Sequence, residues 1–234
     1  MRFRAVLFDV GETLVHPEPT FSSLFASMLS REGFARDVAE VEEASKCIAQ
    51  RFSRASRDRD GWTFAPERSE AFWLGVYSQM LGTLGLRAYD RLLAALFEAF
   101  TDLDNYELFE DVRSSMSTLR SAGLTLGIVS NYEPWLEDLL VRLGIADELD
   151  VRVISGLEGV EKPDLAIYLL ALDRLGLEPA QVAFVGDSPE FDVDPPASLG
   201  MLPILIDRRE RHLKHEGIRI TDLRDLASML EAAA

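Results

Sequence analysis

The chain has 234 residues, 47% of them apolar, which is enough for a sizeable buried core and argues against disorder. Its formal net charge of −16 argues against nucleic acid and anionic membranes as partners. The one cysteine, Cys47, excludes an internal disulfide, and there is neither a signal-peptide pattern nor an apolar run long enough to span a membrane. These features predict a soluble cytoplasmic protein.

The first predicted element is a short buried strand, Ala5–Phe8, that runs directly into an acid. Asp9 would stand at the carboxyl end of this strand, and Gly11 permits a sharp turn just after it. Ligands of open α/β sheets bind outside the carboxyl ends of the strands, so chemistry is expected here. Taken alone, Asp9 is more simply explained as a turn residue, and its role depends on the later strands.

A long helical segment follows, from Phe21 to about Leu103, after two prolines in His16–Thr20 interrupt the chain. Apolar residues recur there at three- and four-residue steps, which predicts a bundle of four amphipathic helices and no strand. One helix begins at Phe21, and the others cover Val38–Phe52, Pro66–Leu84 and Tyr89–Phe100. We therefore predict an inserted helical domain at 16–105 and an α/β domain made of 1–15 and 106–234.

Four arginines lie in the stretch Arg51–Trp62, from the end of the second of these helices into the segment before the third, in an otherwise acidic chain. Arg54 and Arg57 could contact an anionic substrate, because guanidinium groups suit phosphate and carboxylate. The alternative is a solvated helix end whose charge is balanced by Asp58 and Asp60. The second interpretation is slightly favoured.

From Leu108 the pattern alternates between helices and buried strands, which predicts a doubly wound parallel sheet of the α/β class. The predicted strands are Leu124–Val129, Val151–Ile154, Gln181–Val185 and Met201–Ile206. The predicted helices are Asp111–Ala122, Pro134–Leu143, Lys162–Leu175 and Asp222–Leu230. The last strand is a candidate edge strand, because Pro203 removes a ladder donor.

Polar side chains follow three of these strands, and the carboxyl ends of parallel strands share one edge of a sheet. Ser130 follows the strand Leu124–Val129, and Lys162 lies beyond the strand Val151–Ile154. Asp187 follows the strand Gln181–Val185, with Asp192 five residues later. Each could be a cap, turn or surface residue, but their joint occurrence at successive strand ends makes coincidence a poor explanation. Clustered carboxylates repel one another unless a cation binds them, which points to Mg²⁺. Asp9 could then attack phosphorus while Mg²⁺ and Lys162 neutralise the phosphoryl charge.

Together these segments resemble the four motifs of the haloacid dehalogenase-like (HAD) hydrolase superfamily, in the branch with a helical cap after the first motif. The matching segments are Asp9–Leu14, Val129–Asn131, Glu161–Asp164 and Gly186–Asp192. The resemblance covers the whole chain and is specific for the superfamily, but only weakly specific for the substrate. It implies a Rossmann-like core with an inserted cap that opens and closes over the site and selects the substrate.

The resemblance also implies roles for individual residues. Asp9 would be the nucleophile, and Asp9, the backbone carbonyl of Gly11 and Asp187 would bind Mg²⁺, with Asp192 acting through water or from outside the metal's ligands. The phosphoryl oxygens would be bound by the backbone N–H groups that follow Asp9, including the Gly11 region, and by the side chains of Ser130, Asn131 and Lys162.

One departure from the family pattern concerns the acid–base group. Phosphatases of this superfamily usually carry a second Asp two positions after the nucleophile, where this chain has Gly11. Losing a general acid typically costs roughly 10²- to 10⁴-fold in rate. Glu12, His16, Glu133 or a residue of the cap could replace it, and Glu12, which directly follows Gly11, is an acid–base candidate whose side chain could also point away from the site.

The favoured function is therefore a Mg²⁺-dependent phosphatase that acts on small phosphorylated metabolites through an aspartyl-phosphate on Asp9. One alternative is hydrolysis of carbon–halogen bonds, as in the haloacid dehalogenases, which also lack the second Asp but need no metal. Another is a catalytically weak protein that binds phosphorylated ligands or a protein partner, for which Gly11 is the main support. A monomer or a homodimer is expected, with no nucleic-acid or membrane partner.

Overall fold

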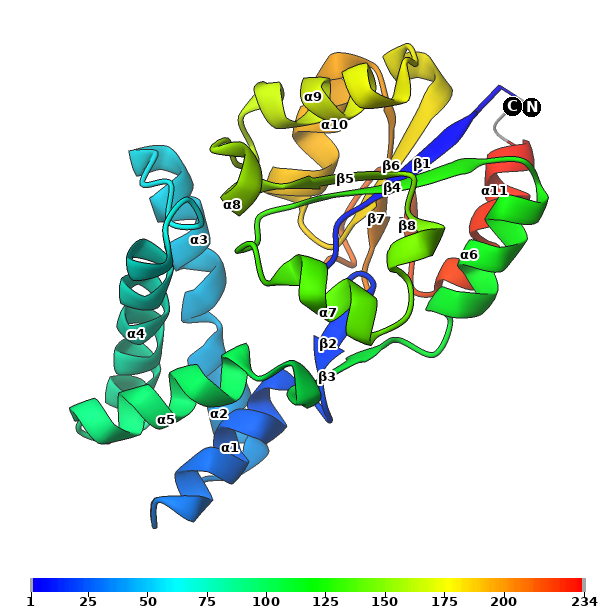
Figure 1. Ribbon diagram of the computed structural model, residues 1–234. Helices are drawn as coiled ribbons and strands as arrows, with labels where there is room; N and C mark the ends of the chain where they lie inside the picture. Colours follow the sequence, from blue (N-terminus) through cyan, green and yellow to red (C-terminus); the bar gives the residue numbers. More distant parts are fainter. Residues whose placement is uncertain (1, 233–234) are drawn as a thin grey trace. The chain divides into compact units, whose positions relative to one another are not determined.

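The computed structural model describes residues 2–232 and divides the chain into two compact units (Figure 1). The core unit is formed by Met1–Val15 and Leu108–Ala234, and the helical unit by His16–Glu107. In the part of the chain that the structure describes, no helix combines the length and apolar character needed to cross a membrane.

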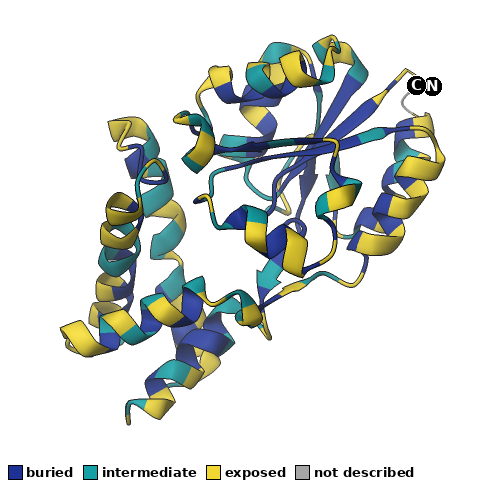
Figure 2. Ribbon diagram, in the orientation of Figure 1, coloured by how far each residue is buried: buried dark blue, intermediate teal, exposed yellow. Residues whose placement is uncertain are grey.

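A six-stranded parallel sheet in the order β5-β4-β1-β6-β7-β8 forms the centre of the core unit. Its strands are β1 Ala5–Phe8, β4 Thr125–Ser130, β5 Val151–Ile154, β6 Val182–Gly186, β7 Leu202–Ile206 and β8 Arg219–Ile220. The strand β1 lies between β4 and β6, and all four of its residues are fully buried (Figure 2). The predicted parallel α/β fold is confirmed.

The prediction of β7 as the edge strand is wrong, because the two-residue strand β8 pairs with β7 on its outer side. Pro203 nevertheless lies where a missing donor is tolerated. It pairs with Phe184 of β6, whereas β8 reaches only Leu205 and Ile206 on the other side of β7.

Helices cover both faces of this sheet, with α9 and α10 on one side and α6, α7 and α11 on the other (Figure 1). Their bounds are α6 Val112–Ser121, α7 Leu136–Arg142, α8 Ser155–Glu158, α9 Leu165–Leu175, α10 Asp194–Leu199 and α11 Leu226–Ala232. The helix predicted at Lys162–Leu175 begins later, because the Asp164 side chain accepts from the Ala166 N–H and caps α9. Lys162 therefore lies in the turn that precedes the helix.

Within the described residues, the helical unit contains five α-helices and a short 3₁₀ turn at Leu103–Asn105, where the sequence predicted four helices. They are α1 Phe21–Arg31, α2 Val38–Ser45, α3 Cys47–Asp58, α4 Pro66–Thr83 and α5 Asp90–Thr101. The predicted helix Val38–Phe52 is divided at Lys46, after α2 has packed Val41 and Ala44 into the core. Leu29, Tyr77 and Leu96 from three other helices join the same apolar cluster.

The chain passes between the two units at two short strands, β2 Val15–Pro17 and β3 Tyr106–Leu108, which form a two-stranded sheet. Neither strand was predicted. Three residues are too few to show an alternating pattern, and Pro17 is the type of residue that argues against a strand.

Candidate active site

Three of the predicted site residues meet at one carboxylate oxygen. Asp9 follows β1, and its backbone N–H donates to the carbonyl of Val185 in β6 at 2.8 Å. Its Oδ1 accepts from Ser130 Oγ at 3.1 Å and from Lys162 Nζ at 2.6 Å. Asp9, Ser130 and Lys162 are all buried. The carboxyl ends of β1, β4 and β6 thus form the edge at which the site is built.

Asn131 positions Lys162 through the backbone of that residue. Its Nδ2 donates to the Lys162 carbonyl at 2.8 Å, and its Oδ1 accepts from the Lys162 N–H at 2.6 Å. These two bonds connect the end of β4 to the turn before α9. Contact between Asn131 and a substrate stays a prediction.

Asp192 is the second partner of Lys162, with 2.7 Å between Asp192 Oδ1 and Lys162 Nζ. Its Oδ2 accepts from the Ser188 N–H at 3.0 Å, and its own N–H donates to the Ser188 carbonyl at 2.7 Å. It lies in a π-helical turn, Pro189–Val193, a type of distortion that is frequent at functional sites. Asp192 is buried, so its charge depends on these partners.

Gly186 leaves the space that Asp192 occupies. A Cβ at position 186 would lie 2.3 Å from Asp192 Cγ, which is closer than atoms can approach. We therefore expect Gly186→Ala to displace Asp192 and to lower the free energy of unfolding by about 1–3 kcal/mol, as overpacking usually does. Denaturant titration measures this. The matched control is Gly82→Ala in α4, where a Cβ meets nothing within 4 Å and the change should be neutral or stabilising. Equal stability of the two variants would contradict the expected clash.

Three carboxylates crowd together at this edge. Asp9, Asp187 and Asp192 each offer an oxygen within 4.8 Å of the others. Desolvation raises the pKa of Asp187 well above its ordinary value, and the charges of Asp9 and Asp192 raise it further. Within residues 2–232, no hydrogen bond or ion pair to the Asp187 carboxylate is found. Asp187 is therefore an acid that lacks a protein donor and stands beside two others.

One ammonium group offsets part of this charge. Desolvation alone would lower the pKa of Lys162, but the charges of Asp192 and Asp9 outweigh it, so the pKa is raised and the side chain stays protonated. Desolvation also raises the pKa of Asp192 to about 6, although Lys162 opposes the shift. Three carboxylates against one cation leave an excess of negative charge. Oxygen donors with such an excess fit a hard divalent cation such as Mg²⁺.

The turn after Asp9 has an open position at Gly11. A Cβ there would meet nothing within 4 Å, and Gly11 does not adopt the left-handed backbone that favours glycine. Glu12 does adopt it, with φ 56°. The Glu12 carboxylate is paired with Arg209, at 2.8 Å between Oε2 and Nη2. Glu12, the acid–base candidate named from the sequence, therefore forms an ion pair with Arg209.

Arg54 and Arg57 lie in the helical unit, on the exposed surface of α3. Arg54 is 80% exposed and pairs with Asp58 at 3.5 Å, one helical turn away. Such pairs on a solvated helix surface contribute little to stability. Contact between these two arginines and a substrate stays a prediction.

Tyr168 of α9 is a site-supporting residue that sequence reasoning missed. Its hydroxyl donates to the carbonyl of Phe191, next to Asp192, and its ring packs against Phe184 with 5.5 Å between centroids. Desolvation, followed by the charges of Asp192 and Asp9, raises the pKa of Tyr168. The sequence pattern of the predicted helix Lys162–Leu175 carries no signal of what the Tyr168 hydroxyl contacts.

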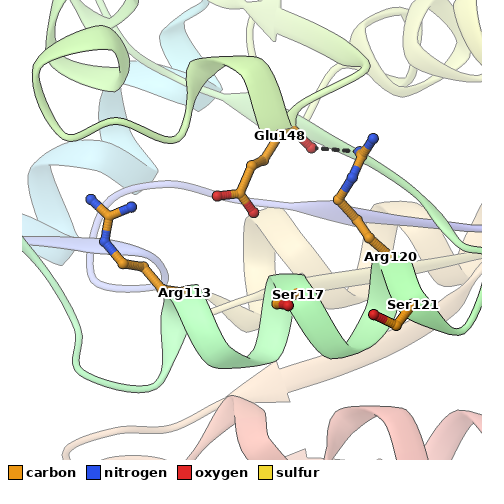
Figure 3. Close-up of a pocket in the computed structure, with 5 residues that line it drawn as sticks. All are labelled: Arg113, Ser117, Arg120, Ser121 and Glu148. Carbon is orange, nitrogen blue, oxygen red and sulfur yellow. Dashed lines mark hydrogen bonds between the residues drawn. The ribbon is translucent and has the colours of Figure 1, made fainter.

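A surface groove of about 510 Å³ lies elsewhere on the core unit, along α6 (Figure 3). The guanidinium groups of its two arginines, Arg113 and Arg120, already donate hydrogen bonds to other residues of the protein. Arg113 donates to the Leu143 and Gly144 carbonyls at the end of α7, and Arg120 donates to the Glu148 carbonyl and to Asp150. Asp150 accepts from the Leu126 N–H, so this groove adjoins the start of β4, opposite to the edge that carries Asp9.

Comparison with known proteins shows the family to which the chain belongs. The profile of the haloacid dehalogenase-like hydrolases matches residues 3–200. The chain is 28% identical to haloacid dehalogenase-like hydrolase domain-containing protein 3 of Danio rerio, with 91% of this chain and 88% of that protein covered. It is 32% identical to a phosphoserine phosphatase of Thermus thermophilus, with 95% and 97% covered.

A solved structure shows the same fold. The L-2-haloacid dehalogenase of Xanthobacter autotrophicus superposes with a TM-score of 0.72 at 23% identity, covering 99% of this chain and 100% of that one. Identity at this level shows the fold and does not transfer the reaction. The family match spans most of the chain and includes all four motif segments. The family predicted from these motifs is therefore confirmed: the chain belongs to the haloacid dehalogenase-like hydrolases and is an enzyme.

Proposed function

We propose that the protein is a Mg²⁺-dependent phosphatase that hydrolyses small phosphorylated metabolites through an aspartyl-phosphate on Asp9. The observation that carries this proposal is the arrangement around Asp9, where Ser130 and Lys162 hold Oδ1 while Asp187 and Asp192 lie within 4.8 Å. The similarity to a phosphoserine phosphatase at 32% identity supports the reaction class.

Asp9 supplies the nucleophile in this scheme. A carboxylate oxygen forms a bond to phosphorus, and the bond between phosphorus and the ester oxygen breaks. Water then attacks phosphorus, which releases inorganic phosphate and restores the Asp9 carboxylate. Ser130 and Lys162 donate hydrogen bonds to the phosphoryl oxygens during both transfers, where negative charge develops.

The metal would be held by Asp9, Asp187 and the carbonyl of Gly11. Asp192 would act through water or from outside the metal's ligands, since its two oxygens accept from Lys162 Nζ and from the Ser188 N–H. When bound, Mg²⁺ supplies positive charge that stabilises the transferring phosphoryl group. The same charge would relieve the repulsion among the three carboxylates, which fits the unpartnered state of Asp187.

The helical unit is proposed to serve as the cap that selects the substrate, with Arg54 and Arg57 as candidate anion contacts. Substrate identity would then depend on side chains of residues 16–107 and not on the carboxylate cluster.

The proposal is tested with a panel of metabolite phosphates in the presence of Mg²⁺. We expect turnover of at least one substrate, which chelation with EDTA and the variant Asp9→Asn each reduce to background. Asp9→Asn removes the nucleophile but keeps the shape of the side chain, so its melting temperature checks that the fold is retained. Phosphatase activity that persists in Asp9→Asn would refute the role of Asp9.

Hydrolysis at carbon is the second candidate, and Gly11 is the observation that favours it, since dehalogenases of this superfamily also lack the second Asp. The charge of the site disfavours it. Asp187 and Asp192 stand beside Asp9, and a departing halide would be repelled by both. Halide release from 2-haloacids in the presence of EDTA would establish this reaction in place of the phosphatase.

A further inference from the structure

The segment that follows β7 holds the turn that follows Asp9. Two consecutive arginines make the contacts. Arg208 donates to the Thr13 carbonyl through Nε at 3.1 Å and Nη2 at 2.8 Å, and Arg209 pairs with Glu12. The two arginines are nearly 200 residues away from Thr13 and Glu12 in the sequence, yet the two pairs lie next to each other at the edge of the sheet.

Arg208 is itself fixed by a buried acid. Its Nη1 and Nη2 donate to the two oxygens of Asp111 at 2.9 and 3.0 Å, and Asp111 also accepts from the Leu223 N–H at 2.7 Å. The Arg208 and Asp111 side chains are only 10% and 2% exposed. The guanidinium also lies 3.9 Å from the centroid of the Phe109 ring. The planar guanidinium of Arg208 contacts Thr13, Asp111 and the Phe109 ring at the same time, and the ammonium group of a lysine could not make all three contacts.

The turn that Arg208 holds is compact. The carbonyl of Val10 accepts from the N–H groups of Leu14 at 2.8 Å and Val15 at 3.0 Å, and Glu12 carries the left-handed backbone. A non-glycine residue in that conformation stores strain that its surroundings must compensate. The turn contains Gly11, whose carbonyl is the proposed metal ligand, and the N–H groups that face the site in the proposed scheme.

We propose that Arg208 is a positioning residue, which fixes the turn Val10–Val15 and thereby the direction of the Gly11 carbonyl and of the Asp9 carboxylate. Within the described residues, Arg208 makes no hydrogen bond to Asp9, Asp187 or Asp192, so its effect on the site would pass through the backbone of Thr13. This inference rests on the proposed function for its catalytic consequence, but its structural consequence can be measured without it.

The test compares Arg208→Lys with Arg219→Lys. Lys keeps the charge of Arg208 but cannot bridge Thr13 and Asp111 together. We expect kcat to fall at least about 10-fold and Mg²⁺ affinity, measured by calorimetry without substrate, to weaken by a similar factor, with KM little changed. Arg219 anchors the same segment through Asp207 at 2.8 Å without contacting the turn. Arg219→Lys should lose stability while kcat and Mg²⁺ affinity stay near those of the wild type.

Hydrogen–deuterium exchange of the peptide that covers residues 10–15 separates the two proposals. Arg208→Lys should accelerate exchange there, and Arg219→Lys should not. If the wild type has no phosphatase activity but exchange changes as expected, the proposed function fails and the positioning role of Arg208 stands. If exchange in the turn is unchanged, or both variants lose activity equally, the positioning role is refuted. Should Arg208→Lys fail to fold, Arg209→Gln provides the same comparison, with smaller effects in the same direction.

Discussion

Replacing Gly11 with Asp is expected to raise the turnover of alkyl phosphates by roughly 10²- to 10⁴-fold, the range that a positioned general acid contributes. An alkyl leaving group departs as a strongly basic oxyanion and needs a proton, which nothing at position 11 can supply in the natural chain. The structure leaves room for the change, because a Cβ at Gly11 meets no atom within 4 Å and the backbone is not left-handed. Steady-state kinetics with alkyl and aryl phosphates measures the effect.

The natural enzyme should accordingly hydrolyse aryl phosphates faster than alkyl phosphates, since an aryl oxide is a good leaving group without protonation. Gly11→Asp should narrow that difference. Gly11→Asn is the matched control, because it fills the same space without an acid and should give no gain. Equal turnover of aryl and alkyl phosphates by the natural chain would mean that another residue already serves as the acid, and Glu12 freed from Arg209 would be the first to examine.

Replacing Lys162 with Met is expected to lower kcat by roughly 10²- to 10³-fold or more, as removal of a donor to a developing oxyanion does. It should also destabilise the metal-free protein by about 3–5 kcal/mol, because one partner of a buried ion pair is lost. Asp9 and Asp192 would then face each other without the ammonium that now lies 2.6 and 2.7 Å from them.

Mg²⁺ should restore part of the stability of Lys162→Met, because the cation neutralises the same two carboxylates. Thermal melts with Mg²⁺ and with EDTA measure this difference. The control is Lys214→Met, which removes an equal charge from an exposed position and should change neither kcat nor the melting temperature appreciably. A Lys162→Met variant as stable as the wild type in EDTA would show that the proximity of the Asp9 and Asp192 carboxylates does not lower the free energy of unfolding. This result would weaken the argument that the site binds a cation.

The sequence identified the residues at the ends of strands because their placement follows from topology. Once β1, β4 and β6 are recognised as parallel strands, Asp9, Ser130 and Asp187 must share one edge, whatever the details of packing. The same reasoning brought Lys162 to this edge, although the start of its helix was misplaced. A signal for the correct start was present in Asp164, which precedes the first apolar residue of α9 and caps it.

Contacts between distant segments were not predictable in the same way. Nothing in the residues around Arg208 indicates that Thr13 and Asp111 are its partners, because the pairing depends on how β7 and α6 are placed across the sheet. Asn131 was expected at a substrate, whereas its visible bonds are to the backbone of Lys162. Strands as short as β8 also escape detection, since two residues cannot show a period.

The central claim is that Asp9 becomes covalently phosphorylated during turnover. Rapid acid quenching of the enzyme with a radiolabelled phosphate monoester and Mg²⁺, followed by peptide mapping, tests it most directly. We predict label on the peptide that contains Asp9, present in the wild type within a single turnover and absent from Asp9→Asn. Full turnover of the substrate with no labelled protein at any time, or with label on another residue, would contradict the account.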